Sequence, residues 1–461
     1  MENLIARLKV VLGPNGALEG ADIGEAYHQD FGRFRNTAPR LVMRPTSTEQ
    51  VSRVMAMCNE AAQPIVAQGG MTGLVDGAVP NKNEIAINLE RMRNLIEFDE
   101  ASATMTVEAG MPLQAVQEIA DERGFLFPLD IGARGSCTIG GNISTNAGGN
   151  RVIRYGMMRD MVLGLEAVLA DGTIISSLNK MIKNNAGYDL KHLFIGSEGT
   201  LGIVTGAVLR LRPKPRSQSV GFTALNSFDD AVALLHHCHE RLGGTLSAFE
   251  AFWPSSYHLV RDRAPNVRLP LTDDHPFYVL IESMGGDEVV DADRFETTLG
   301  DAAEAGWIVD AVIAKSAAEV HALWEVRDGI PEGLFSYQTM LNYDVSLPLG
   351  DMGDLAERMQ KRIDATFPNN RTVFFGHIGD GNLHVSLTIG ADSMERHEEV
   401  DEIIYSMIAE YNGSISAEHG IGRLKRSHLP KSRTEAELDL MHTLKASLDP
   451  KNILGQGRVL C

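Results

Sequence analysis

The chain has 461 residues, of which 44% are hydrophobic and 22% are charged, a composition typical of a folded globular protein. Its length exceeds the size at which one hydrophobic core keeps growing, so we expect two or three domains. The 61 acidic residues outnumber the 42 lysines and arginines and give a formal net charge of -19. Such a charge repels phosphate backbones and anionic membrane surfaces, which argues against nucleic acid as a partner.

The four cysteines, Cys58, Cys137, Cys238 and Cys461, lie far apart and form no CxxC or zinc-finger spacing. They favour reduced thiols and a cytoplasmic protein, or a mitochondrial-matrix-like one in a eukaryote. The first residues, MENLIARLKVVLG, lack the pattern of a signal peptide, and no apolar stretch is long enough for a membrane helix. We therefore expect neither export nor a membrane span.

Residues 41–110 alternate short apolar runs with one helical pattern. LVMRP, PIVAQ and EIAINL predict strands, TSTEQVSRVMAMCNEA predicts a helix with Thr48 as its N-cap, and NLIEFDEASATMTVEAG predicts a hairpin. A second helix should begin at Pro112 and end at Gly124. The stretch 128–150 is too rich in glycine and polar residues to be packed core.

Downstream, VLGLEAVLADGTIISSL predicts a hairpin that turns at Asp171 and Gly172, and IVTGAVLRLRPKP predicts a strand that ends at prolines near residue 215. From there the order strand, helix, strand, strand, helix, strand indicates a ferredoxin-like arrangement. A looser second copy follows, in which FGHIGDGNLH forms a hairpin on a central sheet. Asp392 is expected to cap a helix over 393–411.

Glycine-rich segments lie beside several predicted strands. PIVAQGGMTGL places Gly69, Gly70 and Gly73 directly after a strand, where backbone amides can approach a pyrophosphate closely. It matches neither a Walker A loop nor a Rossmann turn, and an ordinary strand-end turn explains it equally well. SCTIGGNISTNAGGNRVIRYG contains so much glycine and asparagine that a functional loop is favoured over a plain surface loop. FIGSEGTLGIV repeats the theme.

The decapeptide FGHIGDGNLH can bring two imidazoles to one point, because His377 would end one strand and His384 would lie within the next. Glu418, in SAEHGIGRLKR, offers a carboxylate. Two imidazoles and one carboxylate would leave open positions on a Zn, Mn, Fe or Co ion, as in catalytic sites. Spacing alone leaves open that the histidines are only hydrogen-bonded.

QGGMTGL, TIGGNISTNAGGNRVIRYG and GSEGTLGIV together closely resemble the FAD domain of the vanillyl-alcohol oxidase superfamily. FGHIGDGNLH and SAEHGIG resemble its D-2-hydroxy acid dehydrogenase branch, and the match runs from about residue 40 to the C-terminus. The resemblance implies an α+β protein. Such a protein would have an FAD-binding domain of two α+β subdomains over 1–215 and a ferredoxin-like substrate (cap) domain with a central antiparallel sheet and the metal hairpin over 216–412. The segment 413–461 would pack back on the FAD domain.

The resemblance also implies which residues hold FAD, and the binding should be noncovalent because the loop 68–74 contains no histidine or cysteine. The expected cofactor residues are Gln68, Gly69, Gly70, Met71, Thr72, Gly73, Leu74, Pro128, Ser136, Cys137, Gly140, Gly141, Asn142, Ser144, Asn146, Ala147, Gly148, Gly149, Tyr155, Glu198, Gly202 and Ile203.

For the chemistry, the resemblance implies that His377, His384 and Glu418 bind a divalent metal, with Zn first among the candidates. His419 would take the proton of the substrate hydroxyl, since an imidazole works near neutral pH; the alternative is a structural histidine. Arg327 would clamp the substrate carboxylate, with a helix-surface salt bridge as the alternative. Asn382 would either donate to the substrate or close the turn.

The chain departs from the family pattern at several positions. The usual asparagine of the C-terminal string is Gly455. Where family members acting on D-2-hydroxyglutarate carry Thr, Lys and Asn, this chain has Pro331, Asn342 and Ser386, so recognition of a second carboxylate is in doubt. The expected substrate is D-2-hydroxyglutarate, D-lactate or a related D-2-hydroxy acid.

The expected function is an FAD- and metal-dependent dehydrogenase that passes electrons to a non-NAD acceptor, such as a quinone or an electron-transfer flavoprotein. One alternative is a flavin oxidase that reduces oxygen, and another is a flavin- or metal-binding sensor without turnover. Assembly as a homodimer is also considered.

Overall fold

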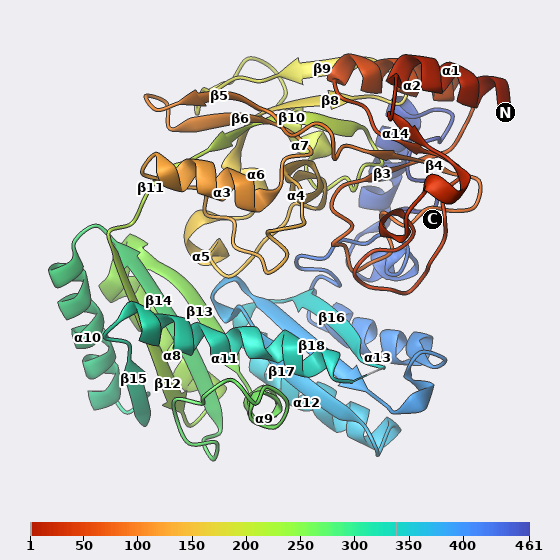
Figure 1. Ribbon diagram of the computed structural model, residues 1–461. Helices are drawn as coiled ribbons and strands as arrows, with labels where there is room; N and C mark the ends of the chain where they lie inside the picture. Colours follow the sequence, from red (N-terminus) through yellow and green to blue (C-terminus); the bar gives the residue numbers. More distant parts are fainter. Residues whose placement is uncertain (1, 338) are drawn as a thin grey trace. The chain divides into compact units, whose positions relative to one another are not determined.

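The computed structural model describes residues 2–337 and 339–461, which form two compact units (Figure 1). The first unit consists of the chain up to Gly149, together with Gly156–Lys214 and Glu418–Cys461. The second unit consists of Asn150–Tyr155 and Pro215–Ala417.

A four-stranded sheet in the first unit has the order β1-β2-β4-β3, with β1 at Ala17–Leu18, β2 at Val42–Met43, β3 at Ile65–Gln68 and β4 at Ile85–Asn88. The strands β2, β4 and β3 run parallel. Helix α2 (Thr48–Glu60) is capped by Ser47, whose side chain accepts a hydrogen bond from the N–H of Gln50, so the N-cap prediction of Thr48 was wrong by one residue.

The second sheet of this unit is antiparallel and has the order β5-β6-β10-β8-β9. Both predicted hairpins are confirmed: β5 (Leu95–Asp99) pairs with β6 (Thr104–Glu108), and β8 (Val162–Val168) pairs with β9 (Ile174–Ser177). Strand β10 (Ile203–Arg210) lies between the two hairpins. A short pair, β7 (Phe125–Leu126) and β11 (Arg212–Pro213), stands apart.

The glycine-rich stretch over 128–150 is more ordered than its composition suggested. Helix α4 (Ile139–Thr145) runs through it and buries Ile139, Asn142 and Ile143, so the expectation that this stretch is not packed core was wrong. The other helices of the first unit are α1 (Glu2–Leu12), α3 (Leu113–Glu122), α6 (Met158–Met161), α7 (Lys191–Phe194) and α14 (Glu435–Leu448).

The C-terminal segment is held to the first unit by a buried ion pair. Arg458 is 3% exposed and binds both carboxylate oxygens of Glu84, at 2.7 and 2.8 Å. The same guanidinium donates to the carbonyl oxygens of Gly77 and Val79. Beside it, Leu454 forms a parallel bridge with Ile65 at the open edge of β3.

The second unit is built on a seven-stranded antiparallel sheet with the order β15-β12-β14-β13-β17-β18-β16. Its first half has the predicted ferredoxin-like order: β12 (Ser217–Leu225), α8 (Phe228–Leu242), β13 (Leu246–Phe252), β14 (Phe277–Gly285), α10 (Glu288–Glu304) and β15 (Asp310–Ile313). Helices α9 (Pro254–Arg263) and α11 (Ala317–Phe335) are additions that the pattern did not include.

The second half repeats this order without its last strand: β16 (Leu341–Ser346), α12 (Met352–Thr366), β17 (Arg371–Gly376), β18 (Asn382–Thr388) and α13 (His397–Glu410). In place of a fourth strand, Ser414 makes a single antiparallel bridge with Ser346. Helix α13 begins at His397 with Arg396 as its N-cap, so the expected cap at Asp392 was wrong; that residue lies in a separate 3-10 turn.

Helices cover both faces of this sheet (Figure 1). Phe222 of β12 packs into a cluster with α9 and α11, whereas its neighbour Gly221 faces Phe295 of α10 on the other side. We call the first side the α11 face. None of the helices in residues 2–337 and 339–461 combines the length and the apolar character that crossing a membrane requires.

The buried pair of Arg458 and Glu84 generates a stability prediction. Burial alone would raise the pKa of Glu84, but Arg458 lowers it overall, so the pair stabilises the fold at neutral pH and loses this effect as the pH falls through the lowered pKa. Arg458→Met leaves the buried carboxylate with Arg423, at 3.5 Å, as its remaining cation. The variant should cost ~3 kcal/mol in the free energy of urea unfolding. Arg7→Met, which breaks an exposed pair with Glu60, should change it by less than ~1 kcal/mol.

Candidate functional site

The first glycine loop leaves β3 with its backbone donors unsatisfied. Among the described residues, no N–H group from Gly70 to Leu74 donates to a protein acceptor. Met71 adopts a left-handed φ of 56° within this loop. Consecutive free N–H groups in such a turn form an anion-binding concavity. This loop fits a diphosphate.

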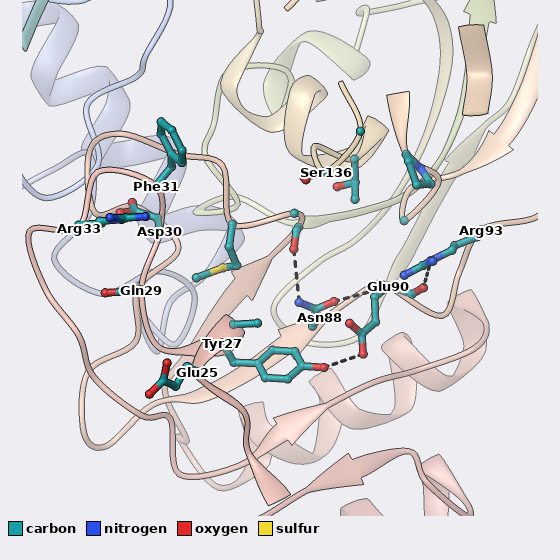
Figure 2. Close-up of a pocket in the computed structure, with 18 residues that line it drawn as sticks. Glu25, Tyr27, Gln29, Asp30, Phe31, Arg33, Asn88, Glu90, Arg93 and Ser136 are labelled. Atoms are coloured by element: carbon teal, nitrogen blue, oxygen red, sulfur yellow. Dashed lines mark hydrogen bonds between the residues drawn. The ribbon is translucent and has the colours of Figure 1, made fainter. Parts of the chain in front are cut away.

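The loop opens into a cavity of about 520 Å³ within the first unit, a size typical of small-molecule sites (Figure 2). Of the predicted cofactor residues, Gly69, Gly70, Met71 and Ser136 line it. The rest of the lining comes mainly from the segments 25–33 and 88–93, which the sequence analysis missed. The one signal that could have found them is the presence of arginines, Arg33 and Arg93, within these polar segments.

The two glycine segments pack directly on each other. A Cβ atom at Gly70 would lie 1.9 Å from the carbonyl oxygen of Ser136, and one at Gly69 would lie 2.6 Å from Oγ1 of Thr138. Thr138 caps helix α4 by accepting a hydrogen bond from the N–H of Gly141. Residues 68–74 and the start of α4 therefore stand side by side, and only glycine permits this approach.

Other predicted cofactor residues are placed by the secondary structure and by hydrogen bonds within the protein. Glu198 has a left-handed φ of 52°, and its two carboxylate oxygens accept hydrogen bonds from the N–H groups of Ile421 and Gly422. Burial raises the pKa of this carboxyl group. Gly202 and Ile203 lie at the start of β10, while Tyr155 ends helix α5 (Val152–Tyr155) in the second unit.

A pair of buried acids lies behind the glycine loop. Asp30 is 3% exposed, lines the cavity and accepts a hydrogen bond from the N–H of Asp76. Burial, and then the neighbouring charge of Asp76, raise the pKa of Asp30 to about 6. Figure 2 shows Asp30 beside Arg33 and Phe31 at the wall of the cavity.

In the second unit the predicted histidine hairpin is confirmed. Strands β17 and β18 pair antiparallel, with Phe375 opposite His384, and His377 directly follows β17. The rings of His377 and His384 lie 5.3 Å apart between centroids and are nearly perpendicular. Both side chains are buried, with 4% and 9% of their surfaces exposed.

Each histidine presents its Nδ1 to a buried carboxylate. His377 Nδ1 lies 2.5 Å from Glu250 Oε1, and His384 Nδ1 lies 3.7 Å from Asp344 Oδ1. Strand register places Glu250, His384 and Asp344 on the α11 face of the sheet. An imidazole that directs Nδ1 at a carboxylate can bind a metal through Nε2, so the two histidines fit two ligands of a divalent ion.

Arg327 reaches this cluster from helix α11. Its Nε donates to Glu250 Oε2 at 2.8 Å, its Nη2 lies 3.5 Å from His377 Nε2, and its guanidinium carbon lies 5.0 Å from the ring centroid of Phe375. The side chain is largely buried, so the alternative of a helix-surface salt bridge was wrong. The cluster therefore contains a buried guanidinium that is paired with Glu250.

The remaining predicted residues occupy neighbouring strand positions. Asn382 donates through Nδ2 to Asp344 at 2.7 Å, and its Oδ1 is buried without a hydrogen-bond partner among the described residues. Asn342 and Ser386 stand opposite each other in β16 and β18 and share a hydrogen bond of 2.7 Å. Both lie on the α11 face, two residues along the same strands from Asp344 and His384.

Glu418 and His419 begin the last segment of the first unit. They directly follow Ala417, whose N–H donates to Asp344 Oδ2 at 3.1 Å in the second unit. Farther along, Gly455 replaces the family's asparagine in a left-handed conformation, with φ 56°. Asparagine and glycine are the residues that adopt this conformation most easily, so the exchange preserves the backbone turn.

Comparison with known families matches two profiles. "FAD binding domain" matches residues 39–177, and "FAD linked oxidases, C-terminal domain" matches residues 214–459. A D-2-hydroxyglutarate dehydrogenase from Xanthomonas citri is 40% identical, over 96% of this chain and 93% of the relative. The mitochondrial D-2-hydroxyglutarate dehydrogenase of Arabidopsis thaliana is 37% identical, over 99% of this chain and 81% of the relative.

A third relative, from Schizosaccharomyces pombe, bears the name "Putative D-lactate dehydrogenase" and is 37% identical over 97% of this chain and 88% of its own length. Among solved structures, p-cresol methylhydroxylase with substrate bound superimposes with a TM-score of 0.79 at 17% identity, covering 99% of this chain and 96% of that one. Alkyldihydroxyacetonephosphate synthase superimposes with a TM-score of 0.76 at 18% identity, over 99% and 85%. These likenesses establish the fold of the vanillyl-alcohol oxidase type, with an FAD-binding domain and an antiparallel-sheet domain. The chain is thus an FAD-linked oxidoreductase and belongs to the D-2-hydroxy acid dehydrogenase family.

Proposed function

We propose that this protein oxidises a D-2-hydroxy acid to the 2-oxo acid with noncovalent FAD and a divalent metal, most simply Zn, and passes the electrons to a quinone or an electron-transfer flavoprotein. The observation that carries the proposal is the buried cluster of His377, His384 and Arg327 on one face of the sheet. It joins two metal-competent nitrogens to a guanidinium suited to a carboxylate.

His377, His384 and Glu418 would hold the metal. The first two project from the hairpin, and the third follows Ala417, whose backbone is tied to Asp344. When bound, a divalent ion makes a coordinated hydroxyl more acidic, and FAD accepts hydride. The open coordination positions left by three protein ligands suit a chelating substrate.

The other residues have roles that follow from their chemistry. His419, next to Glu418, would take the hydroxyl proton. Arg327 would bind the substrate carboxylate through the guanidinium nitrogens other than Nε, which Glu250 occupies. The free Oδ1 of Asn382 can accept a hydrogen bond, since its Nδ2 is taken by Asp344. Asn342 and Ser386 would contact the distal end of the substrate.

We also propose that the protein works in a reducing compartment. All four cysteines are unpaired, with Cys58, Cys137 and Cys238 buried and Cys461 exposed, which favours a reducing compartment such as the cytoplasm or a mitochondrial matrix. Several eukaryotic relatives bear the word mitochondrial in their names. A homodimer would be tested by its mass in solution.

His419→Ala should retain FAD and metal but slow anaerobic flavin reduction by substrate about 100-fold or more, because it removes the proposed base. Loss of the yellow flavin absorbance in a stopped-flow instrument measures this rate. The exposed His442→Ala is the matched control and should reduce at the normal rate. Unchanged reduction in the first variant would reject the assigned base.

Peroxide formed in air at the turnover rate would identify an oxidase instead, and failure of every 2-hydroxy acid to bleach the flavin would favour a sensor.

His377→Ala should lose metal while it keeps the flavin spectrum, because it removes a ligand from the second unit and leaves the glycine loop intact. Metal content by mass spectrometry, and FAD content by absorbance, separate the two effects. The exposed His321→Ala should keep both. A chelator that strips the metal should slow flavin reduction of the parent protein, and an unchanged rate after stripping would remove the metal from the mechanism.

Asn342→Lys should raise the preference for a 2-hydroxy diacid over a 2-hydroxy monoacid by about tenfold. It adds a cation opposite Ser386, which lies two residues after His384 in β18. The ratio of kcat/KM for D-2-hydroxyglutarate and D-lactate measures the change. Asn342→Ala, which adds no charge, should leave the ratio close to that of the parent. An equal ratio in all three proteins would place the distal carboxylate elsewhere.

A further inference from the structure

The carboxylate of Glu250 lies at the centre of the histidine cluster and belongs to none of the predicted roles. It stands in β13 with none of its surface exposed. One oxygen, Oε1, lies 2.5 Å from His377 Nδ1, and the other, Oε2, accepts from Arg327 Nε at 2.8 Å. Both oxygens are thus committed to side chains proposed to act on the substrate or the metal.

Glu250 and Arg327 specify the same tautomer of His377. A carboxylate can only accept, so Nδ1 carries a proton toward Glu250. Arg327 can only donate, so the nitrogen that its Nη2 faces at 3.5 Å, Nε2, carries the lone pair. A metal needs that lone pair. The protein therefore prepares His377 as a ligand before any ion binds.

We propose that Glu250 is a positioning residue, which fixes His377 in the Nδ1-protonated tautomer so that Nε2 can bind a divalent metal and at the same time holds Arg327 beside it. The inference rests on the proposed function. Asp344 has the corresponding place at His384 but at 3.7 Å, and it also serves Asn382 and the N–H of Ala417, so Glu250 makes the closer contact.

Glutamine at this position cannot satisfy both partners. It has one oxygen, and Arg327 Nε and His377 Nδ1 both donate in the native protein. The charged guanidinium keeps the oxygen, so the amide NH2 faces the imidazole. His377 then accepts at Nδ1 and carries its proton on Nε2, the wrong tautomer for a ligand.

The test is isothermal titration calorimetry, in which Zn²⁺ is titrated into the full-length, FAD-loaded and metal-stripped protein. Glu250→Gln should weaken zinc binding about 10- to 100-fold while the flavin spectrum is unchanged. Glu282→Gln is the matched control: this carboxylate is equally buried in the adjacent strand β14 but pairs with Arg151, Gln218, Ser247 and Trp324 and with no metal ligand. It should bind zinc like the parent.

The double variant Glu250→Gln with Arg327→Met separates tautomer control from a merely structural role. Without the guanidinium, the glutamine oxygen is free to accept from Nδ1, so zinc affinity should return to within a few-fold of the parent. It also replaces the buried charges by neutral groups, which protects against failure to fold. Normal zinc affinity in Glu250→Gln, or equally weak affinity in the double variant, overturns the proposal. A parent protein that binds no zinc, or a His377→Ala variant that binds it normally, overturns the proposed metal site instead.

Discussion

A charged carboxylate inside a protein is costly unless it is paired, and this cost organises the second unit. Glu250, Glu282 and Asp344 are all fully buried on the same sheet. An isolated charge there would cost several kcal/mol, so each carboxylate draws a cation, an imidazole or an amide into the interior. Glu250 holds Arg327 and His377, and Glu282 holds Arg151. The polar end of the α11 face is a consequence of these pairings.

In the first unit, buried carboxylates hold the C-terminal segment in place. Glu84 fastens the C-terminal segment through Arg458, and Glu198 fastens it through the N–H groups of two residues of a loop. Neither carboxylate needs to touch a cofactor for its effect. Both hold the segment that contains Glu418 and His419, and Glu198 does so at Ile421 and Gly422, directly after the proposed ligand and base.

The fold can be predicted from the sequence where the determining interactions are local. Alternating apolar residues and glycines specify the hairpin of His377 and His384, and the start of α2 is predicted to within one residue because the Ser47 side chain caps it locally. The fold cannot be predicted where a distant partner decides. Glu250 lies 127 residues from His377 in the chain, and nothing in the string SAFEAFW distinguishes it from an exposed acid. The cavity segments 25–33 and 88–93 were missed for the same reason.

The path of the chain has a consequence for biosynthesis. It passes between the units at four points, because Asn150–Tyr155 belongs to the second unit while the residues on both sides belong to the first, and the last segment returns to the first. The partners that Glu84 and Glu198 find in the last segment leave the ribosome at least 223 residues after these carboxylates. The nucleotide-binding half therefore cannot mature as soon as its early strands emerge. Exchange of either unit between related proteins would be difficult, since neither unit is encoded by one continuous stretch of the gene.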